Sequence, residues 1–65
     1  MDEPLKRIIQ SAGGMRPLAR LLGISPQAVA QWHHVPAKHV LAIETIIGEE
    51  ITRYEMRPDI YGAAP

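Results

Sequence analysis

The sequence predicts an all-α fold of five short helices, arranged as one domain over residues 1–65. Apolar residues recur every three or four positions through most of the chain, which is the period of an amphipathic helix. Glycine and proline interrupt these stripes at positions that suit helix ends. The run 15–34, MRPLARLLGISPQAVAQWHH, has the pattern of two helices joined by a tight turn, a helix-turn-helix. A chain of this length can bury only one core.

The first helix is expected from residue 2 or 3 to about residue 12. Asp2 can cap it, and Pro4 suits its first turn, where no intrahelical N–H is needed. Gly13 and Gly14 end it. Its apolar stripe consists of Leu5, Ile8, Ile9 and Ala12.

The turn Gly23-Ile24-Ser25 places the next two helices. The helix before it is expected to begin near Arg16, with Pro17 in its first turn. It should end at Leu22, because Gly23 can take the positive φ angle that closes a helix. The apolar positions that two crossed helices would share are Leu18, Leu22, Ile24, Val29 and Trp32.

The helix after the turn has a clear start, with Ser25 as N-cap and Pro26 at the first helical position. It is expected to reach about His33, since the residue before Pro36 disfavours the helical region. The fourth helix is expected over 36–47. Its buried stripe is Val40, Ile43 and Ile47, and Leu41 and Ile46 widen that stripe beyond what one small core needs.

The tail, residues 49–65, allows two structures. Thr52 and Glu55 have the spacing of a capping box, which favours one short helical turn ended by Pro58. Residues 50–56 also alternate with a period of about two, the pattern of a strand, although no hairpin turn supplies a partner. We favour the helix.

Several classes of protein and site are not expected. The chain has no cysteine, and its apolar runs are too short to span a membrane. The start, MDEPLKRIIQ, lacks the regions of a signal peptide, so a cytoplasmic protein is expected. His33, His34 and His39 lie near one another, but Pro36 interrupts their geometry and no metal is expected. No paired carboxylates, phosphate loop or activated nucleophile is visible, so neither an enzyme nor a cofactor is expected.

The charges are unevenly distributed although the formal net charge is zero. The stretch from Pro4 to Ile43 holds five lysines and arginines and no acidic residue. From Glu44 onward, five acidic residues outnumber Arg53 and Arg57. A basic stretch within a neutral chain is compatible with DNA binding.

The pattern points to recognition of bases in the major groove. Such a helix reads bases with the outward side chains of its first two turns, while Val29 and Trp32 are expected to point inward. Trp32 as a stacking platform for single strands is the weaker alternative. The expected base contacts are Gln27, Ala28, Ala30 and Gln31. The expected phosphate contacts are Arg16, Ser25, Lys38 and His34, with Arg20 an ordinary surface residue or a further contact.

The stretch from Gly14 to Gly62 resembles small prophage-encoded Cro-like repressors and the YdaS-like antitoxin regulators. The segments LARLLGISPQAVAQW, the following VP and ITRYEMRPDIYG carry the resemblance. It implies a five-helix, lambda-repressor-like DNA-binding domain, with Gln27, Ala28 and Gln31 at base-reading positions. Pro26 stands where related repressors often carry a further base-reading residue. Cro proteins differ in their C-terminal halves, so the resemblance does not decide the structure of the tail.

We therefore expect a transcriptional regulator that binds a palindromic operator in double-stranded DNA as a homodimer and represses by occlusion. It would work in the cytoplasm, at the nucleoid. The alternative is an antitoxin-type interaction module that neutralises a toxin protein through its acidic tail and regulates its own operon. Apolar residues in excess of one core are the candidates for the dimer contact: Leu41, Ile46, Tyr54, Met56, Ile60 and Tyr61.

Overall fold

The computed structural model describes residues 1–65, apart from the side chain of residue 49. The chain forms α1 (Glu3–Ala12), α2 (Met15–Leu22), α3 (Pro26–Ala30), α4 (Val40–Ile47), α5 (Arg53–Met56) and α6 (Pro58–Tyr61), with short 3-10 turns η1 (Ala37–His39) and η2 (Gly48–Glu50). No strand occurs among the residues described, which confirms the all-α prediction. No helix in this part of the chain is long and apolar enough to cross a membrane.

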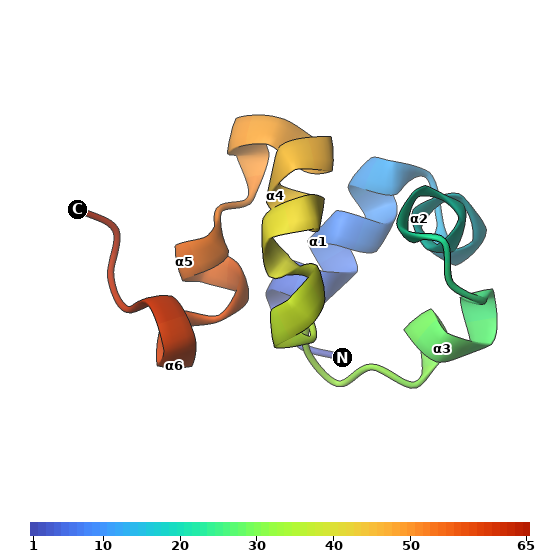
Figure 1. The fold of residues 1–65 in the computed structure, drawn as a ribbon, viewed down its shortest axis with the longest axis horizontal. Helices are drawn as coiled ribbons and strands as arrows, with labels where there is room; N and C mark the ends of the chain where they lie inside the picture. Colours follow the sequence, from blue (N-terminus) through green and yellow to red (C-terminus); the bar gives the residue numbers. More distant parts are fainter.

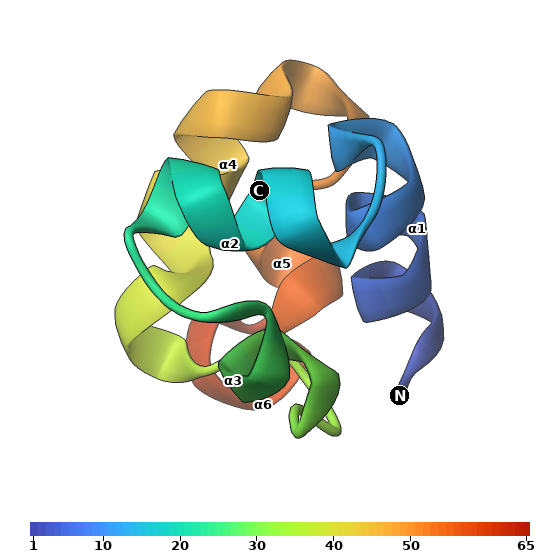
Figure 2. The same ribbon diagram turned by 90° about the vertical axis from the view of Figure 1, so that its right-hand side faces the viewer.

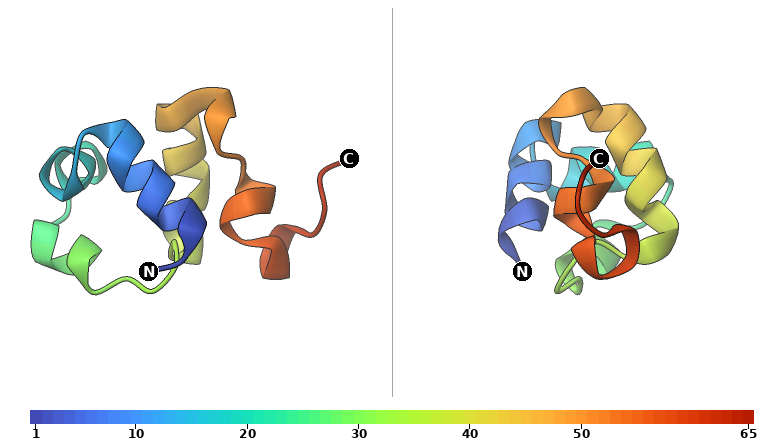
Figure 3. Two further views of the ribbon diagram at one scale, coloured as in Figure 1. Left: turned by 180° about the vertical axis from the view of Figure 1, so that it is seen from behind. Right: turned by 90° about the vertical axis from the view of Figure 1, so that its left-hand side faces the viewer.

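The helices are arranged along an elongated molecule of 32 × 20 × 18 Å. Figure 1 shows α2 and α3 at one end of the long axis and α5 and α6 at the other, with α1 and α4 between them. Seen from the α2–α3 end, α4 lies on one flank and α1 on the opposite flank (Figure 2). The view from the tail end shows the same two flanks, with α5 and α6 now in front (Figure 3).

The helix ends predicted from local signals are present. The Asp2 carboxylate accepts a hydrogen bond from the Leu5 amide at 3.0 Å, and Gly13 ends α1 with a φ of 94°. Gly23 ends α2 with a φ of 71°, in the left-handed region that glycine tolerates best. The Ser25 hydroxyl accepts from the Ala28 amide at 3.1 Å and so caps α3.

Two helices are shorter than predicted. α3 ends at Ala30, whereas the sequence suggested His33, because the chain must leave the helix for Val35 to reach the core, where it is 0% exposed. The last bond of this turn, from the Trp32 amide to the Val29 carbonyl, already spans only three residues. The segment predicted to open the fourth helix is the 3-10 turn η1, and regular α4 begins at Val40.

The tail is helical, which confirms the capping-box interpretation over the strand. The Thr52 hydroxyl accepts from the Glu55 amide at 3.4 Å and starts α5. The sequence pattern does not predict α6, so the predicted number of five helices is one short. Pro58 ends α5 and also occupies the first turn of α6, where its missing N–H costs nothing.

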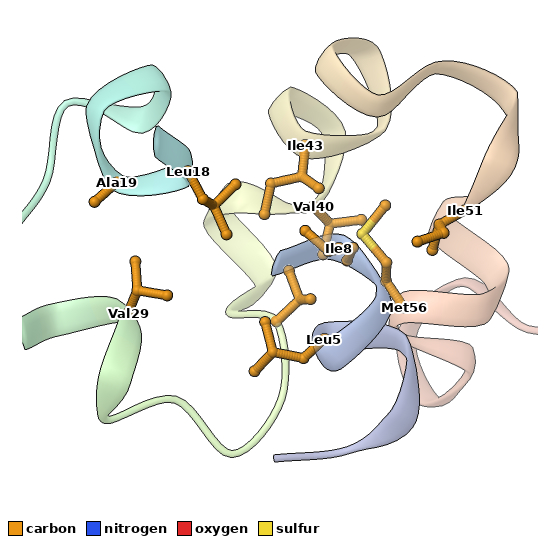
Figure 4. Close-up of a cluster of buried hydrophobic side chains, with 10 residues drawn as sticks. Leu5, Ile8, Leu18, Ala19, Val29, Val40, Ile43, Ile51 and Met56 are labelled. Atoms are coloured by element: carbon orange, nitrogen blue, oxygen red, sulfur yellow. The ribbon is translucent and has the colours of Figure 1, made fainter. Parts of the chain in front are cut away.

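One core joins both halves of the molecule. Figure 4 shows side chains of α1, α2, α3, α4 and the tail converging on a single cluster. Its fully buried members are Leu5, Ile8, Leu18, Ala19, Val29, Val35, Val40, Ile43, Ile51 and Met56. Trp32 and Tyr61 are partly buried and pack against this cluster. The tail therefore completes the core and helps to hold the helix-turn-helix.

Candidate nucleic-acid interface

The exposed surface of α3 carries two glutamines four residues apart. Gln27 and Gln31 are exposed, whereas Val29 is 0% exposed and packs in the core. Val29 thus anchors α3, which lies at the α2–α3 end of the molecule (Figure 2), and both glutamine side chains are exposed to solvent. A glutamine amide presents a donor beside an acceptor, which matches the N6 and N7 edge of adenine.

The two alanines of α3 differ in their exposure. Ala30 is exposed, as expected for a residue that approaches a base. Ala28 is half-buried, and its amide bonds to the Ser25 hydroxyl. A thymine methyl could therefore contact the exposed Ala30 freely, whereas Ala28 is only partly accessible to such a contact.

The amino end of α2 is open to an anion. Its N-cap is Gly14, which has no side chain to bond the first amides of the helix. Arg16 is exposed in that first turn, and the helix has no acidic residue there. Free amides, the helix dipole and a guanidinium together favour a phosphate oxygen at this point.

The remaining candidate phosphate contacts surround α3 at different points. Lys38 is exposed on η1, and His34 is exposed in the loop after α3, with Nδ1 3.3 Å from the Val35 carbonyl oxygen. The Ser25 hydroxyl accepts the Ala28 amide and keeps its own proton available to donate. Arg20 is exposed in the last turn of α2.

The loop that follows α3 is held by contacts that were not predicted from the sequence. The Asp2 amide donates to the His33 carbonyl at 2.8 Å, and Arg57 Nη1 donates to the Val35 carbonyl at 3.1 Å. The Trp32 and His39 rings lie with centroids 5.4 Å apart. The two hydrogen bonds join segments far apart in sequence, and no local signal predicts them. The Arg57 bond connects the tail to the loop after α3.

Ion pairs neutralise charges on the tail side of the molecule. Arg53 bonds both carboxylate oxygens of Glu44, with the shortest side-chain contact 2.7 Å. Arg57 pairs with Asp59 at 2.8 Å. Across the chain, Arg7 of α1 pairs with Glu55 at 2.8 Å.

The cations near the helix-turn-helix have a different environment. Among the described side chains, no ion pair involves Arg16, Arg20 or Lys38. The charges of these three residues are therefore available to a partner. Arg16 and Arg20 lie on α2, at one end of the molecule, and Lys38 lies on η1, just before α4. The zero net charge of the chain conceals this asymmetry.

The tail pairs shift two carboxyl groups in the same direction. Hydrogen bonds from Arg53 lower the pKa of Glu44 below its ordinary value, against a small opposing effect of burial. The hydrogen-bonded guanidinium of Arg57 likewise lowers the pKa of Asp59. Among the described residues, no group of three metal-binding side chains gathers in one place.

The six candidates for a dimer contact fall into three groups. Leu41, Ile46 and Ile60 are exposed, at 48%, 40% and 48% of their surface. Tyr54 and Tyr61 are half-buried. The structure moves Met56 from this candidate surface to the core, because its side chain is only 1% exposed. A further exposed apolar residue, Leu21 of α2 at 56%, was not among the candidates.

Comparison with known proteins places the chain in a family. The family described as "Bacterial toxin YdaS" matches residues 5–65. A protein of Escherichia coli (strain K12), named YdaS and provisionally described as a transcriptional regulator, is 41% identical over 59 residues. That match covers 85% of this chain, which spans 60% of the length of the relative. No solved structure matches the chain significantly. With a family match over nearly its full length and this degree of identity, the chain belongs to the YdaS family.

Proposed function

We propose that this protein regulates transcription by binding double-stranded DNA, with α3 in the major groove. The observation that carries the proposal is the pair Gln27 and Gln31, exposed on a helix that Val29 anchors in the core. Arg16, Lys38, Ser25 and His34 would contact the phosphates on either side. The E. coli relative, described as a transcriptional regulator, supports this class of function.

The regulator would act as a homodimer on a palindromic operator. A single α3 offers few base-reading side chains, and Pro26 at its first position adds no hydrogen-bond donor. Two copies related by a twofold axis double the contacts and define two half-sites. Occupation of such an operator would repress a promoter by excluding the polymerase.

Selection of bound sites from a random DNA pool tests this proposal. The expected result is an enriched motif with adenine at positions that Gln27 or Gln31 can reach, repeated as an inverted pair. The matched control is a selection with the double variant Gln27→Ala, Gln31→Ala, which keeps the fold and the cations. Enrichment of the same motif by this variant, or of no motif by the parent, would contradict the proposal.

The description of the family as a toxin favours a second function, a role in a toxin–antitoxin pair. An acidic tail offered to a partner fits the structure poorly, because Glu55 and Asp59 of the tail are already paired with arginines of the same chain, as is Glu44 of α4. The double glutamine variant separates the two functions in cells. If expression of the parent is harmful and the variant is equally harmful, the effect does not depend on base reading.

A further inference from the structure

We propose that the outer face of α4, formed by Leu41, Ala42, Thr45 and Ile46, is where two copies of this chain meet on DNA. The inference rests on the proposed DNA-binding function and identifies the surface that completes it. All four residues are exposed, and they follow the helical spacing of one face, opposite the buried Val40 and Ile43.

This face carries no charge and few groups that need water. Leu41 and Ile46 are 48% and 40% exposed. The Thr45 hydroxyl donates to the Leu41 carbonyl at 2.9 Å, which satisfies its proton within the helix. The neighbouring Glu44 does not belong to the face, since its carboxylate is held by Arg53.

An uncharged face suits a second copy in particular. In a contact with twofold symmetry the same patch meets itself, so a charged residue near the axis would face an identical charge. Leucine, alanine, threonine and isoleucine raise no such conflict, and Ala42 allows close approach of two helices. A partner recognised by charge would find nothing to bind here.

The position of α4 also fits two copies on one duplex. The α2–α3 ends of both copies must face the same DNA. The twofold axis must therefore lie between the two molecules, parallel to their long axes, and the contact must lie on a flank. Figures 2 and 3 show α4 on a flank when the molecule is viewed from either end. Contact there sets the two copies of α3 side by side.

The exposed Ile60 of α6 does not satisfy this requirement. It lies in the tail, at the end of the long axis opposite α2 and α3 (Figure 1). A symmetric pair joined end to end through the tail would turn its two helix-turn-helix units away from each other. Ile60 is as exposed as Leu41, at 48%, so exposure alone would not separate the two candidates.

The size of the face predicts a weak contact that forms on DNA. A stable interface buries about 800 Å² per partner, which would be about a fifth of the 4132 Å² surface of this chain. Four side chains, two of them alanine and threonine, supply much less than that. Two copies held on adjacent half-sites meet at high effective concentration, where a weak contact is sufficient.

The test compares Leu41→Glu with Ile60→Glu, the same kind of change at equally exposed positions. The probes are the palindrome recovered by site selection and the same duplex with one half scrambled, titrated by fluorescence anisotropy. Both variants should fold, as checked by circular dichroism, and should bind the single half-site as the parent does. Leu41→Glu should lower cooperativity on the palindrome about tenfold or more, because like charges meet. Ile60→Glu should keep it.

The outcomes distinguish this surface from the underlying function. If the parent protein binds the two half-sites independently, the α4 contact between copies is overturned, whereas the proposed DNA binding is not. Unchanged cooperativity in Leu41→Glu, or its loss in Ile60→Glu, also overturns the α4 contact. Absence of specific binding by the parent to either duplex overturns both the contact and the proposed function.

Discussion

Arg57 in the tail donates a hydrogen bond to the carbonyl of Val35, 22 positions earlier, at 3.1 Å. The same guanidinium is held by both carboxylate oxygens of Asp59. Val35 lies in the loop between α3 and α4, so the tail contacts the segment that follows α3, the helix proposed to read DNA. The tail thus supports the proposed DNA-binding end through this bond, although α5 and α6 lie at the opposite end of the molecule (Figure 1).

Replacing Arg57 by alanine should therefore weaken DNA binding without touching a DNA contact. The Val35 carbonyl loses its charged donor, and the loop after α3 then keeps only one of its two long-range hydrogen bonds, the one from the Asp2 amide to the His33 carbonyl. We expect a lower unfolding midpoint and a smaller ratio of operator to random-DNA affinity, with an unchanged salt dependence. Arg53→Ala, which frees Glu44 on the α4 side, is the control and should lower the midpoint without changing that ratio. If Arg57→Ala and the parent had the same ratio of operator to random-DNA affinity, the proposed role of the Arg57–Val35 bond would be wrong.

Gln31→Ala should relax discrimination at one base pair by about 1–3 kcal/mol. The bidentate match to adenine is lost, while the fold and the phosphate contacts remain. Gln10→Ala removes an equally polar, exposed side chain from α1 and should leave discrimination unchanged. Competition titrations with operator duplexes altered at single positions measure the effect. A Gln31→Ala protein with the parent's preferences would show that α3 is oriented differently.

Arg16→Ala should weaken binding to all DNA sequences alike and reduce the slope of log K against log salt by about one. The change removes one phosphate contact and no base contact. Arg7→Ala is its control, since Arg7 is paired with Glu55 and lies outside the helix-turn-helix. An equal loss of slope in both variants would mean that net charge, rather than the position of Arg16, sets the effect.

Leu18→Ala should destabilise the domain by about 2–5 kcal/mol, because it leaves a cavity in the core. Leu18 is 0% exposed, whereas Leu21, on the same helix, is 56% exposed. Leu21→Ala should therefore change the free energy of unfolding by no more than about 0.5 kcal/mol. Urea titration followed by the fluorescence of the single tryptophan compares the two variants. Similar losses in both would contradict the assigned packing of α2.

The carboxyl groups of Glu44 and Asp59 should make the fold sensitive to acid. Both have a lowered pKa in the folded chain, so their pairs stabilise the fold above the ordinary carboxyl pKa values. That contribution is lost as the pH falls through the lowered values. Glu44→Gln and Asp59→Asn should flatten the decline of thermal midpoint from pH 7 to about pH 3, as measured by circular dichroism. If the thermal midpoint of the double variant declined as steeply with falling pH as that of the parent, other groups would be responsible for the acid sensitivity.

The sequence predicts those parts of the fold that depend on near neighbours. Asp2, Ser25 and Thr52 each cap a helix by bonding an amide three residues ahead, and such signals are visible in a short window. The placement of Gln27 and Gln31 on the exposed side follows equally from helical spacing around Val29.

The features that the sequence does not predict depend on distant partners. α3 ends early because Val35 enters a core built from other helices. Met56 was expected on the surface, and only the packing of α5 against α1 and α4 buries it. Only one half of the capping box forms: the Thr52 hydroxyl accepts the Glu55 amide, but the Glu55 carboxylate accepts a hydrogen bond from Arg7 of α1 at 2.8 Å. No local pattern reveals these choices.

The bond from the Asp2 amide to the His33 carbonyl has a practical consequence for handling the protein. Any affinity tag or fluorescent fusion joined ahead of Met1 would enter beside the loop that leaves α3. Such an addition would crowd the surface whose binding is to be measured. The chain end at Pro65 lies at the opposite extremity of the molecule (Figure 1), and a label attached there would leave the α2–α3 end accessible.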